Sequence, residues 1–317
     1  MKVLFVFHDR TNYTGGPALN AVRLLPHLNK LGVSVISACI YPKGQEHPNG
    51  DALEKSGVQV VYKEREVFSE PLALWFLKIV KVNDIDLVVS NINIQAALLC
   101  KTLQPLGIPV IHTHRSNDIL NNGVADFFLK EDNSWSLPAY VFVSEYLRKQ
   151  YPNILPSIQT RIIYSGVESS QYRTNFADFN LIKVIYSGRI EQKQKNIIDI
   201  ANEFIRLIKE GRAYEFTILG SGSKADEVQE AINSSGCQNK IKMIPTLYGV
   251  DYKKELAKHH VILLYSDFEG TPGSILDAMS CGLIPVSSNY EGVEEVIEKE
   301  FNGYILEHLS ELDKVLC

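Results

Sequence analysis

Residues 269–282 read EGTPGSILDAMSCG, a stretch that combines a tight turn, a helix start and two carboxylates. Pro272 and Gly273 make the turn, and the residues that follow have the apolar spacing of a helix. An apolar, strand-like run comes next at residues 283–286. A turn, a helix and a buried strand in this order are typical of a parallel α/β sheet.

The same alternation recurs along the chain and predicts its fold. We expect strands at residues 2–7, 34–39, 59–62, 87–90, 109–112, 140–143, 162–164, 183–186, 215–219, 241–243, 261–265 and 283–287. Helical periodicity marks residues 18–31, 71–82, 94–103, 145–151, 196–210, 225–234, 252–258 and the segment from Ser274, and residues 293–298 complete the pattern.

A polar stretch without this alternation, residues 166–181, divides the chain into two halves. The length of 317 residues also fits two domains of ordinary size. We therefore predict an α/β protein of two Rossmann-like domains, residues 1–168 and 169–317, that face each other across a cleft. Ligands are expected at the carboxyl ends of the strands that line this cleft.

The composition narrows the class of protein. Hydrophobic residues make up 45% of the chain and charged residues 22%, as in soluble globular proteins. The net charge of −5 argues against a general nucleic-acid binder. Five scattered cysteines without a C-x-x-C pattern favour reduced thiols in the cytoplasm over disulfides or zinc. The apolar run at residues 1–7 is shorter than a signal peptide requires, and any membrane contact is expected to be peripheral, at the inner face.

The stretch at residues 269–282 has the chemistry to bind a phosphate. The helix that starts at Gly273 and Ser274 directs free backbone N–H groups and its positive dipole end toward the preceding turn. Glu269 lies on that turn and Asp277 lies about one turn inside the helix, an arrangement that suits a phosphate flanked by two hydroxyl-rich groups, as in a nucleotide-sugar. The alternative is a solvated acidic turn followed by a carboxylate that complements the helix dipole.

A second segment with phosphate-binding chemistry follows the first strand of the second half, where residues 187–189 read SGR. Arg189 and Lys195 lie on a loop that enters the next helix, and two converging cations can neutralise a diphosphate and stabilise it as a leaving group. Lys193 competes with Lys195 for this role. A solvated basic loop is the alternative.

The remaining motifs exclude several classes of site. Gly15 and Gly16 either let the backbone approach a ligand closely or make a plain tight turn. They do not form the G-x-G-x-x-G of dehydrogenases, and no P-loop occurs in the chain. His112 and His114 have no third ligand at metal-binding spacing, and the DID segment at residues 84–86 precedes a strand and is expected to cap a loop. We therefore expect no metal site.

Residues 269–277 resemble the E-x7-E signature of retaining glycosyltransferases of family 4, which have the GT-B fold; Asp277 stands here in place of the second glutamate. Residues 188–195 resemble the G-R-x(4–5)-K element of that family. Weaker similarities are YSGVE at residues 164–168 and LGSG at residues 219–222. The resemblance covers most of the chain.

The resemblance implies a role for each motif in the second half. Arg189 and Lys195 would stabilise the departing diphosphate, together with the helix start at Gly273 and Ser274. Glu269 would contact hydroxyl groups of the donor sugar, and Asp277 would hold the ribose.

In the first half, the resemblance implies that the loop of Gly15 and Gly16 faces the donor and shapes the acceptor site. It also implies that His114 reaches the donor sugar near the reaction centre. His114, the later of the two histidines, fits this role better than His112, which alternation is expected to place inside the strand.

The implied function is metal-independent, retaining transfer of a hexose from a nucleoside diphosphate-sugar, expected to be a UDP-sugar. The acceptor would be a hydroxyl of a glycan or lipid-linked molecule in cell-surface polysaccharide synthesis. The nucleotide-sugar is a substrate, so no cofactor is expected.

Two departures leave alternatives open. Asp277 is one methylene shorter than glutamate, and the chain stops soon after Gly303, where relatives continue. A non-catalytic subunit that works with a protein partner or as an oligomer fits both departures, and a sugar-nucleotide epimerase would share the fold.

Overall fold

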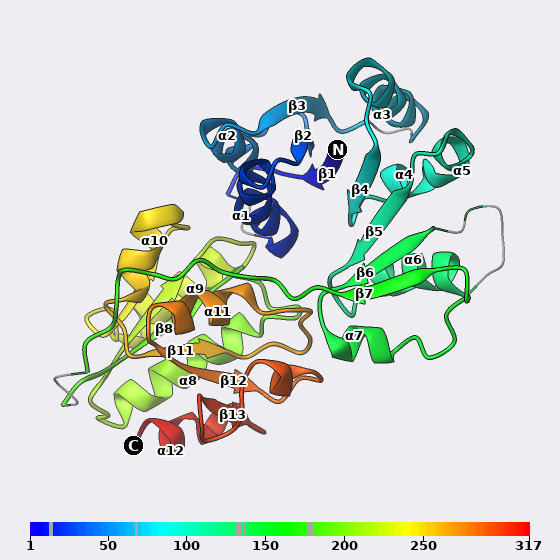
Figure 1. Cartoon of the computed structure of the whole chain (residues 1–317). Coiled ribbons are helices and arrows are strands. Elements are labelled where there is room, and N and C mark those ends of the chain that lie inside the picture. The colour runs from blue at the N-terminus through cyan, green and yellow to red at the C-terminus, as the bar shows by residue number, and fades with distance from the viewer. Residues whose placement is uncertain (13–14, 67–68, 131–134, 136, 177–179) are drawn as a thin grey trace. The chain divides into compact units, whose positions relative to one another are not determined.

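The chain forms two compact units, Met1–Gly166 and Val167–Cys317, in a computed structural model that describes residues 1–12, 15–66, 69–130, 135, 137–176 and 180–317 (Figure 1). Each unit is an α/β domain built on a parallel sheet. The two domains are described separately below.

The first domain contains a seven-stranded sheet with the strand order β3-β2-β1-β4-β5-β6-β7. Its strands are β1 (Lys2–His8), β2 (Ser34–Tyr41), β3 (Gln59–Glu64), β4 (Leu87–Asn91), β5 (Val110–His114), β6 (Ala139–Phe142) and β7 (Gln159–Ile162). Its helices are α1 (Gly16–Lys30), α2 (Pro48–Lys55), α3 (Ser69–Asn83), α4 (Ile94–Leu98), α5 (Cys100–Leu103), the 3₁₀ turn η1 (Gln104–Leu106), α6 (Ile119–Leu129) and α7 (Glu145–Lys149).

The second domain contains a six-stranded sheet with the strand order β10-β9-β8-β11-β12-β13. Its strands are β8 (Ile182–Ser187), β9 (Tyr214–Leu219), β10 (Ile241–Ile244), β11 (Val261–Leu264), β12 (Ile284–Ser288) and β13 (Tyr304–Leu306). Its helices are α8 (Ile197–Lys209), α9 (Ala225–Ser235), α10 (Gly249–Leu256), α11 (Gly273–Ser280) and α12 (Leu312–Leu316), with the 3₁₀ turns η2 (Val293–Glu295) and η3 (Leu309–Glu311).

Both sheets carry cores on their two faces, which explains why their strands read as continuous apolar runs. In β1, Leu4 and Val6 belong to one buried cluster, whereas Phe5 and Phe7 belong to another on the opposite face. Successive side chains of a strand point to opposite faces, so a two-sided core requires apolar residues at every position.

The predicted pair of parallel α/β domains is confirmed, and each expected strand is present within a few residues. The described part of residues 166–181 holds no helix or strand, as expected of a connection. The single helix expected at residues 94–103 is divided into α4 and α5, and α2, α6, β13 and α12 were not predicted from the sequence.

The sequence did not predict helix α2 because a residue distant in the sequence stabilises its start. Its sequence, PNGDALEK, begins with residues typical of a turn. The carboxylate of Asp9 accepts hydrogen bonds from the backbone N–H groups of Asn49 (2.8 Å) and Gly50 (3.0 Å), and from the Asn49 side chain (2.7 Å). Asp9 therefore supplies, from the end of β1, the helix cap that the local sequence lacks.

Two glycines of the second domain let the loops after β8 and β9 approach closely. A Cβ on Gly220 would lie 1.9 Å from the carbonyl oxygen of Gly188, and one on Gly222 would lie 2.3 Å from that of Ile190. The backbone N–H of Ile190 donates to the carbonyl of Ser221 at 2.9 Å across the same contact. The LGSG segment therefore holds the start of the loop that carries Arg189.

We expect Gly220→Ala to lower the free energy of unfolding by about 2 kcal/mol or more, because the methyl group would overlap backbone atoms and Gly220 has φ = +150°. Urea unfolding followed by circular dichroism measures the change. Gly123→Ala is the matched control, since a Cβ there meets nothing within 4 Å in helix α6. Equal stability of the two variants would contradict the packing role of Gly220.

Candidate functional site

The predicted phosphate-binding segments meet at the carboxyl edge of the second sheet. Strands β8 and β11 are parallel neighbours, with Tyr186 opposite Leu263. The loops that leave them, residues 188–196 and 265–272, therefore start side by side before they enter α8 and α11. The carboxyl end of a parallel sheet is where open α/β domains bind ligands.

An ion pair between Lys195 and Glu269 joins the two loops. The Lys195 ammonium donates to Oε1 of Glu269, and it lies 3.5 Å from the hydroxyl of Ser266. Both charged side chains are nearly buried, with exposed fractions of 12% for Lys195 and 11% for Glu269. Among the described residues, Oε2 of Glu269 has no hydrogen-bond donor. The pair thus holds a carboxylate with one oxygen available.

Arg189 lies on the first of these loops and is more exposed than Lys195. Its guanidinium donates to Oε2 of Glu191 at 2.9 Å and to the side-chain oxygen of Gln194. The Gln194 amide in turn donates to the carbonyl of Phe268 at 2.8 Å. Gln194 therefore links Arg189 to the loop that carries Glu269, a role that the sequence analysis missed.

The backbone of the first loop is held in an unusual conformation. Gln194 and Asn196 have φ values of +75° and +49°, in the left-handed region that non-glycine residues seldom occupy. Asp267 stabilises both, because its N–H donates to the carbonyl of Gln194 (2.9 Å) and its carboxylate accepts from the Asn196 side chain (2.6 Å). Such residues concentrate at functional sites, where neighbouring contacts offset their cost.

Helix α11 begins without a side-chain cap. The N–H groups of Ile275 and Leu276 both donate to the carbonyl of Pro272, at 3.0 and 3.2 Å. The N–H groups of Gly273 and Ser274 have no acceptor in the described part of the chain. Two free donors at the positive end of a helix dipole form a site for an anion.

Asp277 lies on the inner face of α11, where it is 2% exposed. Its Oδ1 accepts from the Lys253 ammonium of helix α10 at 2.7 Å, and the same ammonium donates to the Ser280 hydroxyl at 2.7 Å. Lys253 is a second residue that the sequence analysis missed, since no local pattern connects α10 to α11. Its ion pair offsets the cost of burying the carboxylate.

In the first domain, Gly15 is the N-cap residue of α1 and Gly16 is its first residue. His114 ends β5 and is completely buried, with Tyr140, Phe142 and Tyr151 around its ring at centroid distances of 5.5–6.1 Å. Its Nε2 has no hydrogen-bond partner among the described residues. Positions two apart in a strand share a face, and His112 is buried like His114, so alternation does not distinguish the two histidines as expected. The contact of His114 with a donor sugar stays a prediction.

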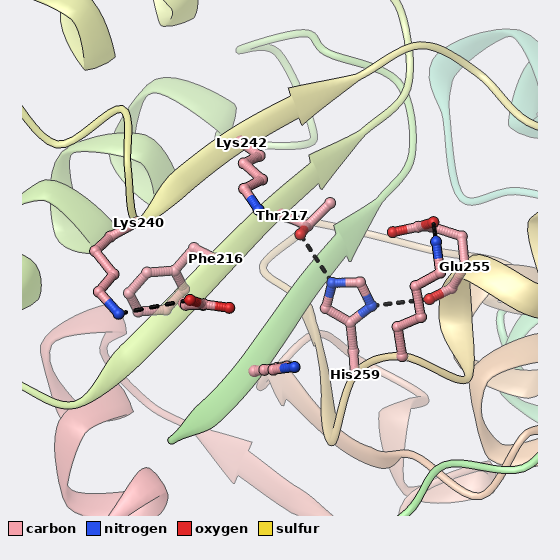
Figure 2. A pocket seen from close by; sticks show the side chains of 9 residues that line it. Phe216, Thr217, Lys240, Lys242, Glu255 and His259 are labelled. Atoms are coloured by element: carbon pink, nitrogen blue, oxygen red, sulfur yellow. Dashed lines mark hydrogen bonds and ion pairs between the residues drawn. The ribbon is translucent and has the colours of Figure 1, made fainter. Parts of the chain in front are cut away.

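A hollow of about 200 Å³ lies elsewhere in the second domain (Figure 2). It is lined by amino-terminal parts of β8, β9 and β10 and by residues at the end of α10. His259 accepts from Thr217 at 2.8 Å through Nε2 and donates to the carbonyl of Glu255 at 2.9 Å through Nδ1. Burial lowers the pKa of His259. No predicted site residue lines this hollow.

The described residues contain no group of three His, Cys, Asp or Glu side chains that could hold a metal ion. In the DID segment, the carboxylate of Asp86 accepts from the backbone N–H of Lys2 at 2.7 Å. Within the same part of the chain, no helix combines the length and apolar character needed to cross a membrane.

We expect Lys195→Met and Glu269→Gln each to lower the free energy of unfolding by about 3 kcal/mol, because each leaves the partner charge nearly buried and unpaired. The double variant should lose much less than the sum. Urea unfolding of the four proteins of this cycle measures the coupling. Additive losses would show that the ion pair does not hold the loops together.

We expect the first domain to lose stability as the pH falls from 6.5 toward 4. Burial lowers the pKa of His114 to about 4 and that of His112 to about 3, whereas both titrate near 6.5 when unfolded. The unfolded chain then binds more protons in this window, so each histidine should cost about 1–2 kcal/mol between pH 6.5 and pH 5.

The readout is the slope of unfolding free energy against pH, which His114→Asn should flatten. An equal slope in the wild type and His114→Asn would show that the imidazole is not buried in its neutral form.

Comparison with known proteins connects this geometry to a group of enzymes. Residues 182–314 match the family model of glycosyl transferases group 1. This segment contains every predicted site residue of the second domain.

Two curated relatives have names that assign them to polysaccharide biosynthesis. The amylovoran biosynthesis glycosyltransferase AmsK of Erwinia amylovora is 25% identical over 47% of this chain and 39% of its own length. The capsular polysaccharide biosynthesis glycosyltransferase CapH of Staphylococcus aureus is 24% identical over 99% of this chain and 87% of its own length. Matches to AmsK and to two further relatives span 39%, 40% and 32% of those proteins, about two fifths or less.

Solved structures share the fold over the whole chain. HepE of Anabaena in complex with UDP-glucose has a TM-score of 0.76 at 16% identity, and the match covers 100% of this chain and 88% of that one. The expected GT-B fold, as two Rossmann-like domains, is thereby confirmed. The chain thus has the GT-B fold, and its second domain is similar to glycosyl transferases group 1.

Proposed function

We propose that this protein is a retaining GT-B glycosyltransferase of family 4 that uses a UDP-sugar in the synthesis of a cell-surface polysaccharide. The observation that carries the proposal is the juxtaposition, at one sheet edge, of the Lys195–Glu269 pair and the free N–H groups of Gly273 and Ser274. This edge lies in the segment that matches the glycosyl transferases group 1 model. The named relatives of polysaccharide synthesis support the pathway class.

In this proposal, the diphosphate of the donor lies against the start of α11. The N–H groups of Gly273 and Ser274 would donate to phosphate oxygens, and Lys195 and Arg189 would add two positive charges. Both cations have carboxylate partners in the free protein, so phosphate binding would redirect part of their hydrogen bonding. Charge that develops on the leaving diphosphate would then meet donors that are already in place, with no metal required.

Glu269 is positioned to bind the donor sugar. Lys195 holds Oε1, which leaves Oε2 to accept a hydrogen bond from a sugar hydroxyl. Asp277 is proposed to bind the ribose. Lys253, which donates a hydrogen bond to Asp277, would hold that carboxylate in position. The two carboxylates would thus contact hydroxyl groups on either side of the diphosphate.

The proposed reaction breaks the bond between the anomeric carbon and the β-phosphate oxygen and forms a bond from that carbon to the acceptor oxygen. Attack from the face that the phosphate leaves would retain the anomeric configuration. The acceptor hydroxyl would give its proton to the departing phosphate, so UDP and the glycoside are the products. The first domain, with the loop of Gly15 and Gly16, would contribute the acceptor site.

Calorimetric titration with UDP, GDP and ADP in EDTA tests the proposal. We expect micromolar binding of UDP, weaker binding of GDP and ADP, and at least tenfold weaker UDP binding in Lys195→Met. Lys240→Met is the matched control, because Lys240 lines the hollow at the opposite edge of the sheet. Absence of binding of any nucleotide to the folded wild type would overturn the proposal.

A single backbone donor can be removed for a sharper test. Gly273 is the first residue of α11, a position that favours proline, so Gly273→Pro deletes one N–H group and keeps the helix. UDP binding should weaken about tenfold in Gly273→Pro and remain in Gly273→Ala. Equal affinities would show that α11 does not hold the diphosphate.

A further inference from the structure

A cationic site is present at the carboxyl edge of the first sheet. The strand order reverses there between β1 and β4: the chain moves outward from β1 through β2 to β3, and then in the other direction from β4 through β5 to β7. Ligands of open α/β sheets bind at such a reversal. Arg115 follows β5 directly, beside the end of β4.

Within the described part of the chain, the guanidinium of Arg115 hydrogen-bonds to neutral groups alone. Nε donates to the side-chain oxygen of Asn91 at 2.5 Å, and one terminal nitrogen donates to that of Asn20 at 2.6 Å. The other terminal nitrogen lies 3.4 Å from the Ser165 hydroxyl. These partners come from β4, α1 and the end of the domain, so distant parts of the chain fix the guanidinium.

Asn91 is itself fixed, which makes this a built site. Its side-chain oxygen also accepts from the Thr113 hydroxyl at 3.0 Å, and its amide donates to the carbonyl of Pro17 at 2.9 Å. Asn91 is completely buried. The orientation of the guanidinium therefore follows from the core of the domain and not from a mobile surface contact.

The charge of Arg115 is uncompensated. No carboxylate of the described residues pairs with it, in contrast to Arg189, Arg206 and Arg212. Burial lowers the pKa of Arg115 to about 10, so the group stays charged at neutral pH. A half-buried cation without a counter-charge is unfavourable, and an anionic ligand would remove this cost.

The guanidinium also keeps donors for such a ligand. The guanidinium has five N–H groups, and the three contacts described above use three of them. One N–H group therefore remains on each of the two terminal nitrogens. Two N–H groups in a planar fork match the two oxygens of a carboxylate or phosphate.

We propose that Arg115 binds an oxyanion, a phosphate or a carboxylate, carried by the sugar acceptor. The proposal rests on the proposed function, in which the donor diphosphate occupies the second domain and the acceptor the first. The acceptor is then an acidic molecule, either a phosphate-linked carrier or a glycan with an acidic sugar.

Calorimetry with two probes, pyrophosphate and glucuronate, tests this site in the presence of saturating UDP. One of the two probes should bind the wild-type protein and bind at least tenfold more weakly to Arg115→Gln and Arg115→Lys; the lysine keeps the charge but lacks the fork. Pyrophosphate binding would indicate a phosphate-linked acceptor, and glucuronate binding an acidic sugar. Arg161→Gln, an exposed arginine of β7, is the matched control and should bind as the wild type does.

Three outcomes would overturn the proposal: neither probe binds, both arginine variants bind as the wild type does, or Arg115→Gln loses UDP binding itself. The last outcome would show that Arg115 belongs to the binding site of the donor and not to that of the acceptor. If the wild type binds no UDP, the proposed function fails on that result. The same titrations without UDP would then still decide whether Arg115 binds an oxyanion.

Discussion

The parallel pairing of β8 with β11 is the constraint on which the candidate site depends. The chain leaves both strands at the same edge of the sheet, so the loop of Arg189 and Lys195 meets the loop of Glu269 although about 74 residues separate them. The nearly buried ion pair of Lys195 and Glu269 follows from this pairing. Its energy depends on both partners being present, because either charge alone would be costly at that depth.

Close backbone packing between the loops after β8 and β9 supports the same edge of the sheet. Gly220 and Gly222 let the loop after β9 lie against residues 188–190, at distances that exclude any side chain. This explains a glycine pattern at a strand end without a direct ligand contact. Further along the same loop, Gln194 keeps a left-handed backbone conformation because the N–H of Asp267, on the loop after β11, donates to its carbonyl.

The end of β5 shows how burial separates adjacent residues into different roles. His114 points into an aromatic cluster, where burial keeps its imidazole neutral, whereas Arg115 extends to polar groups at the sheet edge. Neighbouring positions of a strand point to opposite sides, so a one-residue difference decides between core and site. A histidine at a strand end is therefore a weaker indication of a ligand contact than the arginine beside it.

The sequence by itself determined the fold class and the elements of the second domain from β8 to β12, because apolar runs and the turn at Pro272 and Gly273 are local signals. It also indicated Arg189, Lys195 and Glu269 as one group. Only the tertiary structure decided that Lys253 pairs with Asp277, that Asp9 caps α2, and that no carboxylate of the described residues pairs with Arg115. These facts depend on contacts between residues 24 or more positions apart, and burial and charge compensation at such contacts cannot be read from a local pattern.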